Sequence, residues 1–542
     1  MSDSSSSRRR FLQQTAALGL LYSSRHGFAQ MQGQMHDMRQ MSPAQKPIPN
    51  APDKNVPMLH VLQLTPFVDA LPVPETMGVA HPGKLRITMR EIHAKIHRDV
   101  PPTRMWSYGP TPLAPIIEAR SGHPLEIEWV NNLPTTHFLP IDHSLHGCGH
   151  DIPDVRTTTH VHGARVPSKA DGYPTDWFVP GKSRTCVYPL KQDAAALWYH
   201  DHAMGLNRLN TYAGLFGLFL VRDEAEDSLH LPSGKYEIPL ILYDRELTAD
   251  GQLFYPTSGD PEHPWVSEFE GDGIFINGKI RPYFEVEPRL YRFRILNTAN
   301  SRFFSLSLDT QEPITQIGSD QGLLSAPADL QHLTLAPAER GDVLIDFSRS
   351  AGKTLHLRNG ALDILQFRVA AQTASPNPSV SVPKTLRTIE RIPESSAITT
   401  RTITLDEYED KVGNSMLMLL NHKRWHEPVT ERPKLNTTEI WEFVNLTADT
   451  HPLHLHLVRF QLLDRRRFDV FSYYTYKKLR YTADAVPPAP GEAGWKDTIQ
   501  CPPKTITRII VRFEGYTGNY LYHCHVLEHE ANDMMRPFEV IA

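Results

Sequence analysis

The sequence predicts an all-β protein assembled from several β-sandwich domains. Segments that alternate apolar and polar residues, with Gly, Pro, Asn or Asp at their ends, recur along the chain, and this pattern is typical of half-buried strands. The chain contains 45 prolines, a residue excluded from helix interiors and central strands, and it has no convincing long amphipathic helix. The clearest alternating segments lie at 124–134, 291–300, 342–348, 439–464 and 507–525.

One sequence pattern occurs three times. Each time, a predicted strand ends in an Asn-rich corner and is followed by another predicted strand. Residues 292–308 (RFRILNTANSRFFSLSL) resemble 439–457 (EIWEFVNLTADTHPLHLHL) and, more weakly, 125–136 (LEIEWVNNLPTT). These echoes predict three copies of one sandwich domain, and a length of 542 residues suits three or four units of about 150 residues. We therefore expect domains at 55–226, 233–370 and 399–542, joined by an external Pro- and Ser-rich connection at 371–398.

The N-terminal part of the chain has the composition of a targeting segment. An arginine triplet at 8–10 precedes Phe11 and a mildly apolar stretch, which resembles a twin-arginine export signal covering residues 1–29. Such a signal implies a periplasmic or secreted protein, and a disordered basic tail is the alternative. Residues 30–54 are expected to form a flexible Met-rich leader, for which low complexity is a simpler explanation than weak metal binding.

The charge and the apolar content argue against nucleic-acid binding and against a membrane span. The formal net charge of −5 gives no electrostatic footprint for nucleic acid. No uninterrupted apolar run approaches the roughly 20 residues of a membrane span. We therefore expect neither a nucleic-acid partner nor a membrane span, and we expect the protein to be a monomer.

Histidine is abundant, at 27 residues, and part of it is arranged in four His-x-His pairs. In a strand, residues i and i+2 point to the same face, so each pair presents two imidazoles side by side. Two pairs lie in the expected first domain and two in the expected last domain, which predicts one site for three metal ions between these domains. Imidazole suits copper, zinc and iron, and an isolated core histidine is the alternative for any single pair. The pairs are His160/His162, His200/His202, His454/His456 and His523/His525.

Cys524 decides among these metals. A thiolate with His451, His529 and a weak axial Met534 is the ligand set of a blue-copper electron-transfer centre. A zinc site would require several cysteines or a CxxC element, and the sequence has neither. Because Cys524 alternates with two histidines along a strand, its sulfur points to one face and the imidazoles to the other. Two metal centres should therefore lie about 10 Å apart on opposite faces of one strand.

The motifs THVHG, WYHDH, HPLHLH and HCHVLEHEANDMM, in this order, resemble those of the multicopper oxidases. Intervening phrases such as RLNTYAGLFG, LAPAERGDVLIDF and AVPPAPGEAGWKDTIQ are similar to the bacterial spore-coat laccase branch, and the resemblance covers nearly the whole chain after residue 55. It implies three cupredoxin-like Greek-key β-sandwich domains and four copper ions per chain. It assigns His451, Cys524, His529 and Met534 to the type 1 copper, His160 and His454 to type 2, and His162, His200, His202, His456, His523 and His525 to the type 3 pair.

The resemblance also implies a reaction. Members of the family remove four single electrons from reducing substrates at the type 1 copper and use them to reduce dioxygen to water at the trinuclear cluster. Glu530 and Asp171 match acidic positions that deliver protons in the resembling laccases, and ordinary surface carboxylates are the alternative.

The cysteines depart from this branch. If Cys524 binds copper, Cys148, Cys186 and Cys501 remain, so at most one disulfide can form. At the middle-domain position where the branch leads us to expect a cysteine, this chain has Glu270 and no cysteine, so a disulfide is not expected there.

The expected substrates are dioxygen and small aromatic reductants. Residues 468–496 contain several aromatics and no methionine, whereas oxidases devoted to cuprous ion carry a Met-rich insert near the type 1 site. This difference favours phenols, aromatic amines or tetrapyrroles. A metallo-oxidase for Cu(I) or Mn(II) and a bilirubin oxidase are the alternatives within the same chemistry. A copper-binding protein without turnover and a copper nitrite reductase are the alternatives from other classes.

Overall fold

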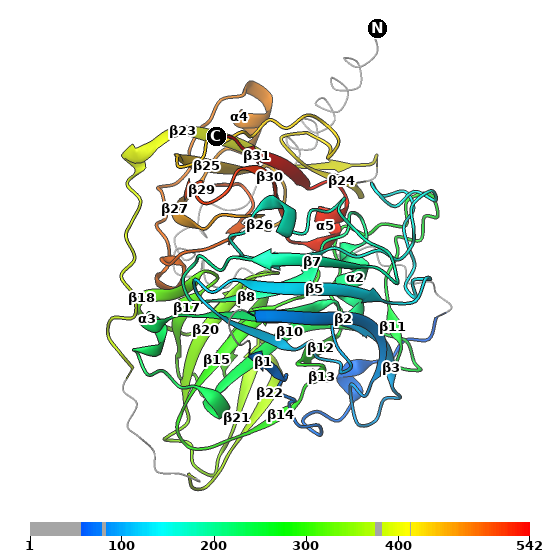
Figure 1. Cartoon of the computed structure of the whole chain (residues 1–542), viewed down its shortest axis with the longest axis vertical. Helices are drawn as coiled ribbons and strands as arrows, with labels where there is room; N and C mark the ends of the chain where they lie inside the picture. Colours follow the sequence, from blue (N-terminus) through cyan, green and yellow to red (C-terminus); the bar gives the residue numbers. More distant parts are fainter. Residues whose placement is uncertain (1–55, 79–82, 374–381, 412) are drawn as a thin grey trace, which may run out of the picture. The chain divides into compact units, whose positions relative to one another are not determined.

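The computed structural model describes residues 56–78, 83–373, 382–411 and 413–542. The predicted export signal at 1–29 and the predicted leader at 30–54 lie outside the described residues, as does part of the predicted connection at 371–398. The described residues all belong to one unit that spans residues 47–542. Their strands form three pairs of β-sheets that follow one another along the chain (Figure 1).

The first sheet pair is formed by strands between residues 76 and 222. One sheet has the order β1 (Thr76–Gly78), β4 (Ile116–Arg120), β9 (Phe216–Arg222), β8 (Ala195–Asp201) and β6 (Thr159–His162). The other has the order β3 (Thr103–Ser107), β2 (Gly83–Ala94), β5 (Leu125–Asn132) and β7 (Ser183–Tyr188). Buried and partly exposed residues alternate along β5, as its sequence pattern predicts, whereas every residue of β6 and β8 is buried. The strands that carry the first two His-x-His pairs are therefore central to the fold.

The second sheet pair lies between residues 237 and 369. Its larger sheet has the order β13 (Lys279–Ile280), β12 (Gly273–Ile276), β10 (Glu237–Leu247), β15 (Leu290–Asn297), β20 (Arg340–Asp346), β17 (Ile314–Ser319) and β18 (Gly322–Leu330), with β11 (Leu253–Phe254) paired to β10. The smaller sheet has the order β14 (Tyr283–Val286), β22 (Leu362–Val369), β21 (Thr354–Asn359), β16 (Phe304–Leu308) and β19 (Leu333–Leu335).

The third sheet pair lies between residues 397 and 540. One sheet has the order β24 (Ser415–Leu420), β23 (Ala397–Glu409), β25 (Thr438–Asn445), β29 (Thr505–Arg512) and β27 (Phe460–Arg467). The other has the order β28 (Thr498–Cys501), β26 (His451–Leu455), β30 (Gly518–Cys524) and β31 (Met535–Val540). All residues of β26 are buried, which places the third His-x-His motif in the interior.

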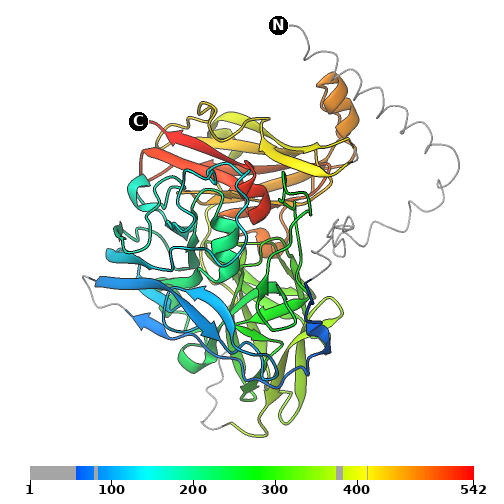
Figure 2. The same ribbon diagram turned by 90° about the vertical axis from the view of Figure 1, so that its right-hand side faces the viewer.

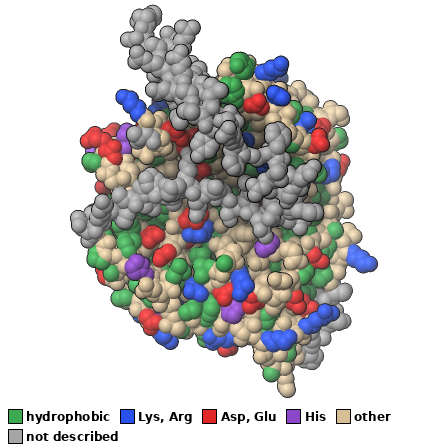
Figure 3. All heavy atoms as spheres, turned by 180° about the vertical axis from the view of Figure 1, so that it is seen from behind, with side chains coloured by type: hydrophobic (Ala, Val, Ile, Leu, Met, Phe, Trp, Pro, Cys, Tyr) green, Lys and Arg blue, Asp and Glu red, His purple; other side chains and the backbone are tan. Residues whose placement is uncertain are grey.

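Helices in the described residues are short connections. They are α2 (Asn207–Ala213), α3 (Glu224–Asp227), α4 (Val470–Tyr476) and α5 (Leu527–Ala531), with single 3₁₀ turns at Val61–Gln63, Ser168–Ala170, Gly234–Tyr236, Glu394–Ser396 and Pro490–Glu492. Among these residues no helix is long and apolar enough to cross a membrane. The segment before β1 contacts the second sheet pair, because Met58 bridges to Thr248 and Ala70 bridges to Tyr283. On the face drawn in Figure 3, acidic and basic side chains are interspersed.

The three predicted Asn-rich corners share one hydrogen-bond arrangement. Oδ1 of Asn131, Asn297 and Asn445 accepts a bond from the backbone N–H two residues later, at 3.1, 2.9 and 2.9 Å respectively. The Nδ2 group of each donates to backbone carbonyls elsewhere in its own sheet pair. All three asparagines are fully buried. The sequence repeat therefore encodes one type of corner. In it, the side-chain amide of a buried asparagine forms hydrogen bonds with backbone N–H and C=O groups where a strand ends.

Two large hydrophobic clusters and three smaller ones stabilise the described sheets. The first extends through the first and third sheet pairs and includes the buried indoles of Trp129, Trp198 and Trp441. The second belongs to the middle sheet pair, around Phe293 and Phe367. The first cluster contains residues of β8 and of β30, such as Trp198 and Tyr522, and so helps to hold these histidine-bearing strands in position.

Candidate metal centres

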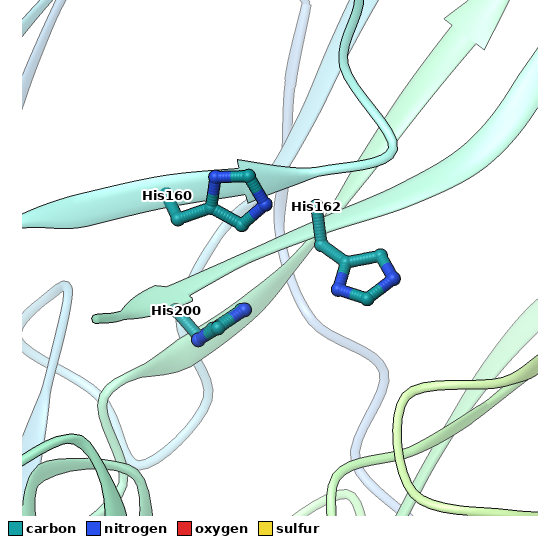
Figure 4. A group of neighbouring side chains, drawn as sticks. All are labelled: His160, His162 and His200. Carbon is teal, nitrogen blue, oxygen red and sulfur yellow. The ribbon is translucent and has the colours of Figure 1, made fainter. Parts of the chain in front are cut away.

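The two antiparallel strands β6 and β8 bring the first two His-x-His pairs together. His160 is directly opposite His200 in the strand register. Figure 4 shows His160, His162 and His200 projecting from these neighbouring strands into the same region. His202 follows immediately after β8, and its ring centroid lies 5.4 Å from that of His160. All four side chains are at most 1% exposed.

Strands β26 and β30 supply the other two pairs from the third sheet pair. His454 is directly opposite His523 in the register. Across the boundary between the sheet pairs, the ring centroids of His162 and His454 lie 3.6 Å apart, and those of His160 and His456 lie 3.9 Å apart. The four His-x-His pairs therefore form one buried imidazole cluster, as the sequence predicts.

Hydrogen bonds to backbone carbonyls fix which ring nitrogen of several imidazoles is free. Nδ1 of His160 donates to the carbonyl of Asp171 at 2.5 Å, and Nδ1 of His454 donates to that of Asp497 at 2.7 Å. Nδ1 of His200 donates in the same way to Asp201 at 2.9 Å. A carbonyl can only accept, so each of these rings carries its proton on Nδ1 and keeps a lone pair on Nε2.

The free imidazole nitrogens fit metal ions. Buried ring nitrogens without a hydrogen-bond partner include His160 Nε2, His200 Nε2, His454 Nε2 and both nitrogens of His525. A buried polar atom without a partner is costly in a protein interior, and a cation binding the lone pairs removes this cost. Burial lowers the pKa of His160 and His200 well below its usual range and that of His202 to about 4, so these three rings are neutral at pH 7. Sets of three donor atoms within 4.8 Å of one another are offered by His160/His162/His200, His160/His454/His456 and His202/His456/His523.

A second centre lies where β26 begins and β30 ends, next to α5. Sγ of Cys524 lies 3.6 Å from Nδ1 of His451 and 3.6 Å from Nδ1 of His529, and the two Nδ1 atoms are 3.2 Å apart. Met534 is fully buried, and its carbonyl accepts the N–H of Cys524 at 3.0 Å. This donor set of one thiol and two imidazoles, with a thioether residue next to it, suits copper.

Comparison with known proteins agrees with this donor chemistry. Two family models described as multicopper oxidase match residues 150–226 and 393–542. A laccase of Bacillus subtilis is 45% identical over 512 residues, covering 88% of this chain and 99% of the relative. The chain belongs to the multicopper oxidase family. A laccase of Haloferax volcanii is 38% identical, covering 88% of this chain and 85% of the relative, and the multicopper oxidase LPR1 of Arabidopsis thaliana is 33% identical, covering 89% and 94%.

Solved structures share the fold of this multicopper oxidase. The crystal structure of a laccase from Pediococcus acidilactici has a TM-score of 0.72 at 27% identity and covers 88% of this chain and 96% of that chain. The McoA multicopper oxidase of Aquifex aeolicus has a TM-score of 0.73 at 26% identity, covering 88% and 100%. The described sheets are therefore cupredoxin-like, and the prediction of an all-β, cupredoxin-like protein is confirmed.

Both acids singled out from the sequence contact the imidazole cluster of this multicopper oxidase. Oδ2 of Asp171 lies 2.8 Å from Nδ1 of His456. Oε2 of Glu530 lies 3.2 Å from Nδ1 of His523, and Oε1 lies 3.4 Å from Nε2 of His202. Burial raises the pKa of Asp171 well above its usual range, and it would raise that of Glu530 too, but His523 and His202 lower it. Both carboxylates are at most 1% exposed, so they are not ordinary surface groups.

Sequence reasoning missed a third buried acid, Asp497, which joins all three sheet pairs. Its carboxylate lies 3.0 Å from Nε2 of His162 in the first pair. From the second pair, Arg340 donates to both carboxylate oxygens, and Gln321 donates to one of them at 2.6 Å. Gln321 also donates to the carbonyl of Gly163, which directly follows His162. The sheet pair that carries none of the predicted ligands thus holds the ligand strand in place.

A fourth acid, Glu268, lies at the thiolate centre. Its Oε1 lies 3.2 Å from Nε2 of His529, and its side chain is 34% exposed. Burial alone would lower the pKa of His529, but its contacts with Cys524 and Glu268 raise that pKa. The sequence places Glu268 about 260 residues before His529, so no local motif could have indicated the contact.

The cysteines form no disulfide. All four, Cys148, Cys186, Cys501 and Cys524, are buried free thiols. Glu270 occupies the middle-domain position at which the resembling laccases lead us to expect a cysteine. It forms an ion pair with Arg302 at 3.0 Å.

Proposed function

We propose that this multicopper oxidase is a laccase-type enzyme that oxidises phenols, aromatic amines or tetrapyrroles by single electrons and reduces dioxygen to water. One observation carries the proposal: Cys524 contacts two imidazoles of one centre, while its chain neighbour His523 lies within the imidazole cluster of the other. Its relatives in Bacillus subtilis and Haloferax volcanii, which match most of the chain, are named laccases and support this activity. When bound, copper supplies the one-electron steps and the reduction of dioxygen.

We assign four copper ions per chain to the two centres. His451, Cys524, His529 and Met534 would hold the type 1 ion, and His160 and His454 the type 2 ion. The type 3 pair would be held by His162, His200, His202, His456, His523 and His525. The partnerless, neutral imidazole nitrogens of the buried cluster support this assignment.

The chain's own residues would supply position and protons. Thr447 Oγ1 lies 2.7 Å from Nε2 of His451 and so orients Nδ1 of that ring toward Cys524. Reduction of one dioxygen molecule to two waters consumes four electrons and four protons. Asp171 and Glu530 are buried and directly contact His456 and His523 of the imidazole cluster, so we assign proton supply to them.

We further propose that the enzyme is exported as a folded monomer. The arginine triplet at 8–10 and the apolar stretch after it support a twin-arginine route and a periplasmic or secreted location. Cell fractionation before and after conversion of the triplet to glutamine would test this. Retention of the variant in the cytoplasm is expected, and unchanged export would contradict the proposal.

The decisive test combines copper analysis, absorption and oxygen uptake on one preparation. We expect four copper ions per chain, an intense thiolate-to-copper band near about 600 nm and oxygen consumption with 2,6-dimethoxyphenol. Oxygen consumption without hydrogen peroxide release would show that four electrons reach each dioxygen molecule. A colourless protein, or one that binds a single copper ion, would contradict both the ligand assignment and the oxidase activity.

A further inference from the structure

One stretch of the third sheet pair exposes an unusual concentration of large apolar side chains. Most of the large apolar residues that are exposed in the described part of the chain lie between residues 471 and 486. Every residue from 474 to 487 is exposed. The apolar members and their exposed fractions are Phe471 (62%), Tyr474 (46%), Tyr476 (68%), Leu479 (40%), Tyr481 (37%) and Val486 (44%).

This exposure is built into the fold and does not result from a frayed end. Asp469 caps α4, because its carboxylate accepts the N–H of Ser472 at 3.0 Å and its hydroxyl at 2.8 Å. Tyr473 packs against the small hydrophobic cluster that contains Phe468, with ring centroids 5.7 Å apart. Phe471 belongs to a different face of the same short helix. The side of α4 that carries Tyr473 is thus packed against the protein, whereas the side that carries Phe471 is apolar and exposed to solvent.

The exposed aromatics also contact one another and neighbouring cations. The rings of Phe471 and Tyr476 lie 6.2 Å apart in an edge-to-face arrangement. Nζ of Lys477 lies 5.5 Å from the ring of Tyr474, and the guanidinium of Arg466 lies 3.8 Å from the ring of Tyr481. These contacts hold the rings outward as a group.

The stretch is basic, although the whole chain has a formal net charge of −5. Lys477, Lys478 and Arg480 are all exposed, and Asp484 is the one acid between residues 474 and 487. Figure 2 shows the orange segment that carries α4 projecting from the third sheet pair. The result is a convex, aromatic and cationic surface, which we call the α4 surface and define as residues 471–486.

We propose that the α4 surface docks the protein on an anionic lipid bilayer. Tyrosine and phenylalanine rings partition into the headgroup region, and adjacent lysines and arginines are attracted to anionic headgroups. A convex surface of this kind can enter a deformable interface, whereas a protein partner would need a matching hollow. A second copy of the chain would set Lys477, Lys478 and Arg480 against the same cations, which disfavours a symmetric dimer.

Flotation with lipid vesicles tests the proposal. The full-length, copper-loaded protein is mixed with vesicles rich in phosphatidylglycerol or with vesicles of pure phosphatidylcholine. We expect binding to the phosphatidylglycerol vesicles only, and a strong decrease in high salt. The double variants Phe471→Ser/Tyr476→Ser and Lys477→Glu/Lys478→Glu should each weaken binding by roughly tenfold or more.

Two controls separate the α4 surface from other causes. The double variant Leu62→Ser/Ile398→Ser removes apolar side chains that are 53% and 63% exposed elsewhere, and it should bind like the wild type. All variants keep the N-terminal arginine triplet, so a contribution from that segment cancels in the comparison. The visible absorption band of the thiolate centre should be unchanged in every variant, because none of these residues contacts a metal centre.

Three outcomes would overturn the proposal. One is that the wild-type protein does not bind to phosphatidylglycerol vesicles. Another is binding that the two α4 variants do not weaken. The third is a concentration-dependent dimer in analytical ultracentrifugation that the Phe471→Ser/Tyr476→Ser variant abolishes, because that result would assign the surface to a second copy of the chain.

Discussion

Oε1 of Glu268, in the loop before β12, lies 3.2 Å from Nε2 of His529 in α5. An acid from the second sheet pair therefore touches the outer nitrogen of an imidazole whose Nδ1 faces Cys524. Glu268 is 34% exposed, whereas His529 is fully buried, so a reductant reaching this imidazole from solvent meets the carboxylate first. The negative charge of Glu268 should therefore influence which electron donors the enzyme oxidises most efficiently.

The variant Glu268→Gln should change donor preference. Removing one negative charge a few ångströms from the donor should lower kcat/KM for a cationic aromatic diamine and raise it for ferrocyanide, each by about five- to tenfold at low salt. Steady-state kinetics with both donors measures the ratio. Glu270→Gln, which removes an equal charge two residues away, serves as the control and should shift the ratio less. Equal ratios in wild type and Glu268→Gln would contradict the role of Glu268.

The buried pair of Arg340 and Asp497 should matter for stability. Arg340→Met leaves the Asp497 carboxylate buried and unpaired, so the free energy of unfolding should fall by about 3–5 kcal/mol. The matched control is Arg432→Met, since Arg432 pairs with Glu539 at the surface and such pairs contribute about 0–1 kcal/mol. Denaturant titration of both variants measures the difference. A loss no greater than that of the control would show that the network around His162 does not depend on this pair.

The two buried acids should affect turnover and leave the thiolate centre intact. In Glu530→Gln and Asp171→Asn the visible absorption band should keep its position and intensity, while oxygen consumption should slow by roughly a hundredfold or more if each acid supplies protons. Stopped-flow reduction of the thiolate centre without oxygen should proceed at the wild-type rate. Wild-type oxygen consumption in both variants would contradict the proton role, and a lost band would point to a structural role.

Two buried cysteines of the same sheet, Cys501 on β28 and Cys524 on β30, should behave differently. Cys524→Ser should abolish the intense visible band, because the thiolate ligand is lost. Cys501 is directly opposite His451 in the strand register, and burial raises its pKa to about 12, so it is an inert thiol. Cys501→Ala should therefore keep the band. Absorption spectra at equal protein concentration make the comparison, and loss of the band in both variants would show that the spectrum reports general unfolding.

His137 should make the folded state sensitive to acid. Burial lowers its pKa from 6.5 to about 3, so the unfolded chain takes up a proton first as the pH falls. The contribution of His137 to stability is complete above about pH 6.5 and decreases by about 1.4 kcal/mol per pH unit below it. His137→Gln should be less stable at pH 7 but should lose less stability between pH 6.5 and 4.5. Parallel losses in the two proteins would show that other groups dominate acid unfolding.

The sequence by itself determined the features that depend on local spacing. Alternation within β5, the three asparagine corners and the four His-x-His pairs follow from the two-residue period of a strand, which sets the face of each side chain before any tertiary contact forms. For the same reason, the position of Cys524 between two histidines could be interpreted as a link between two centres.

Only the tertiary structure decided which distant residues complete those centres. Asp497, Arg340 and His162 come from three different sheet pairs, and Glu268 reaches His529 from a loop of the second. The segment 56–72 also precedes the first sheet pair in sequence but bridges to the second. Such contacts depend on how the sheet pairs pack against one another. The alternation of residues within a strand carries no information about that packing.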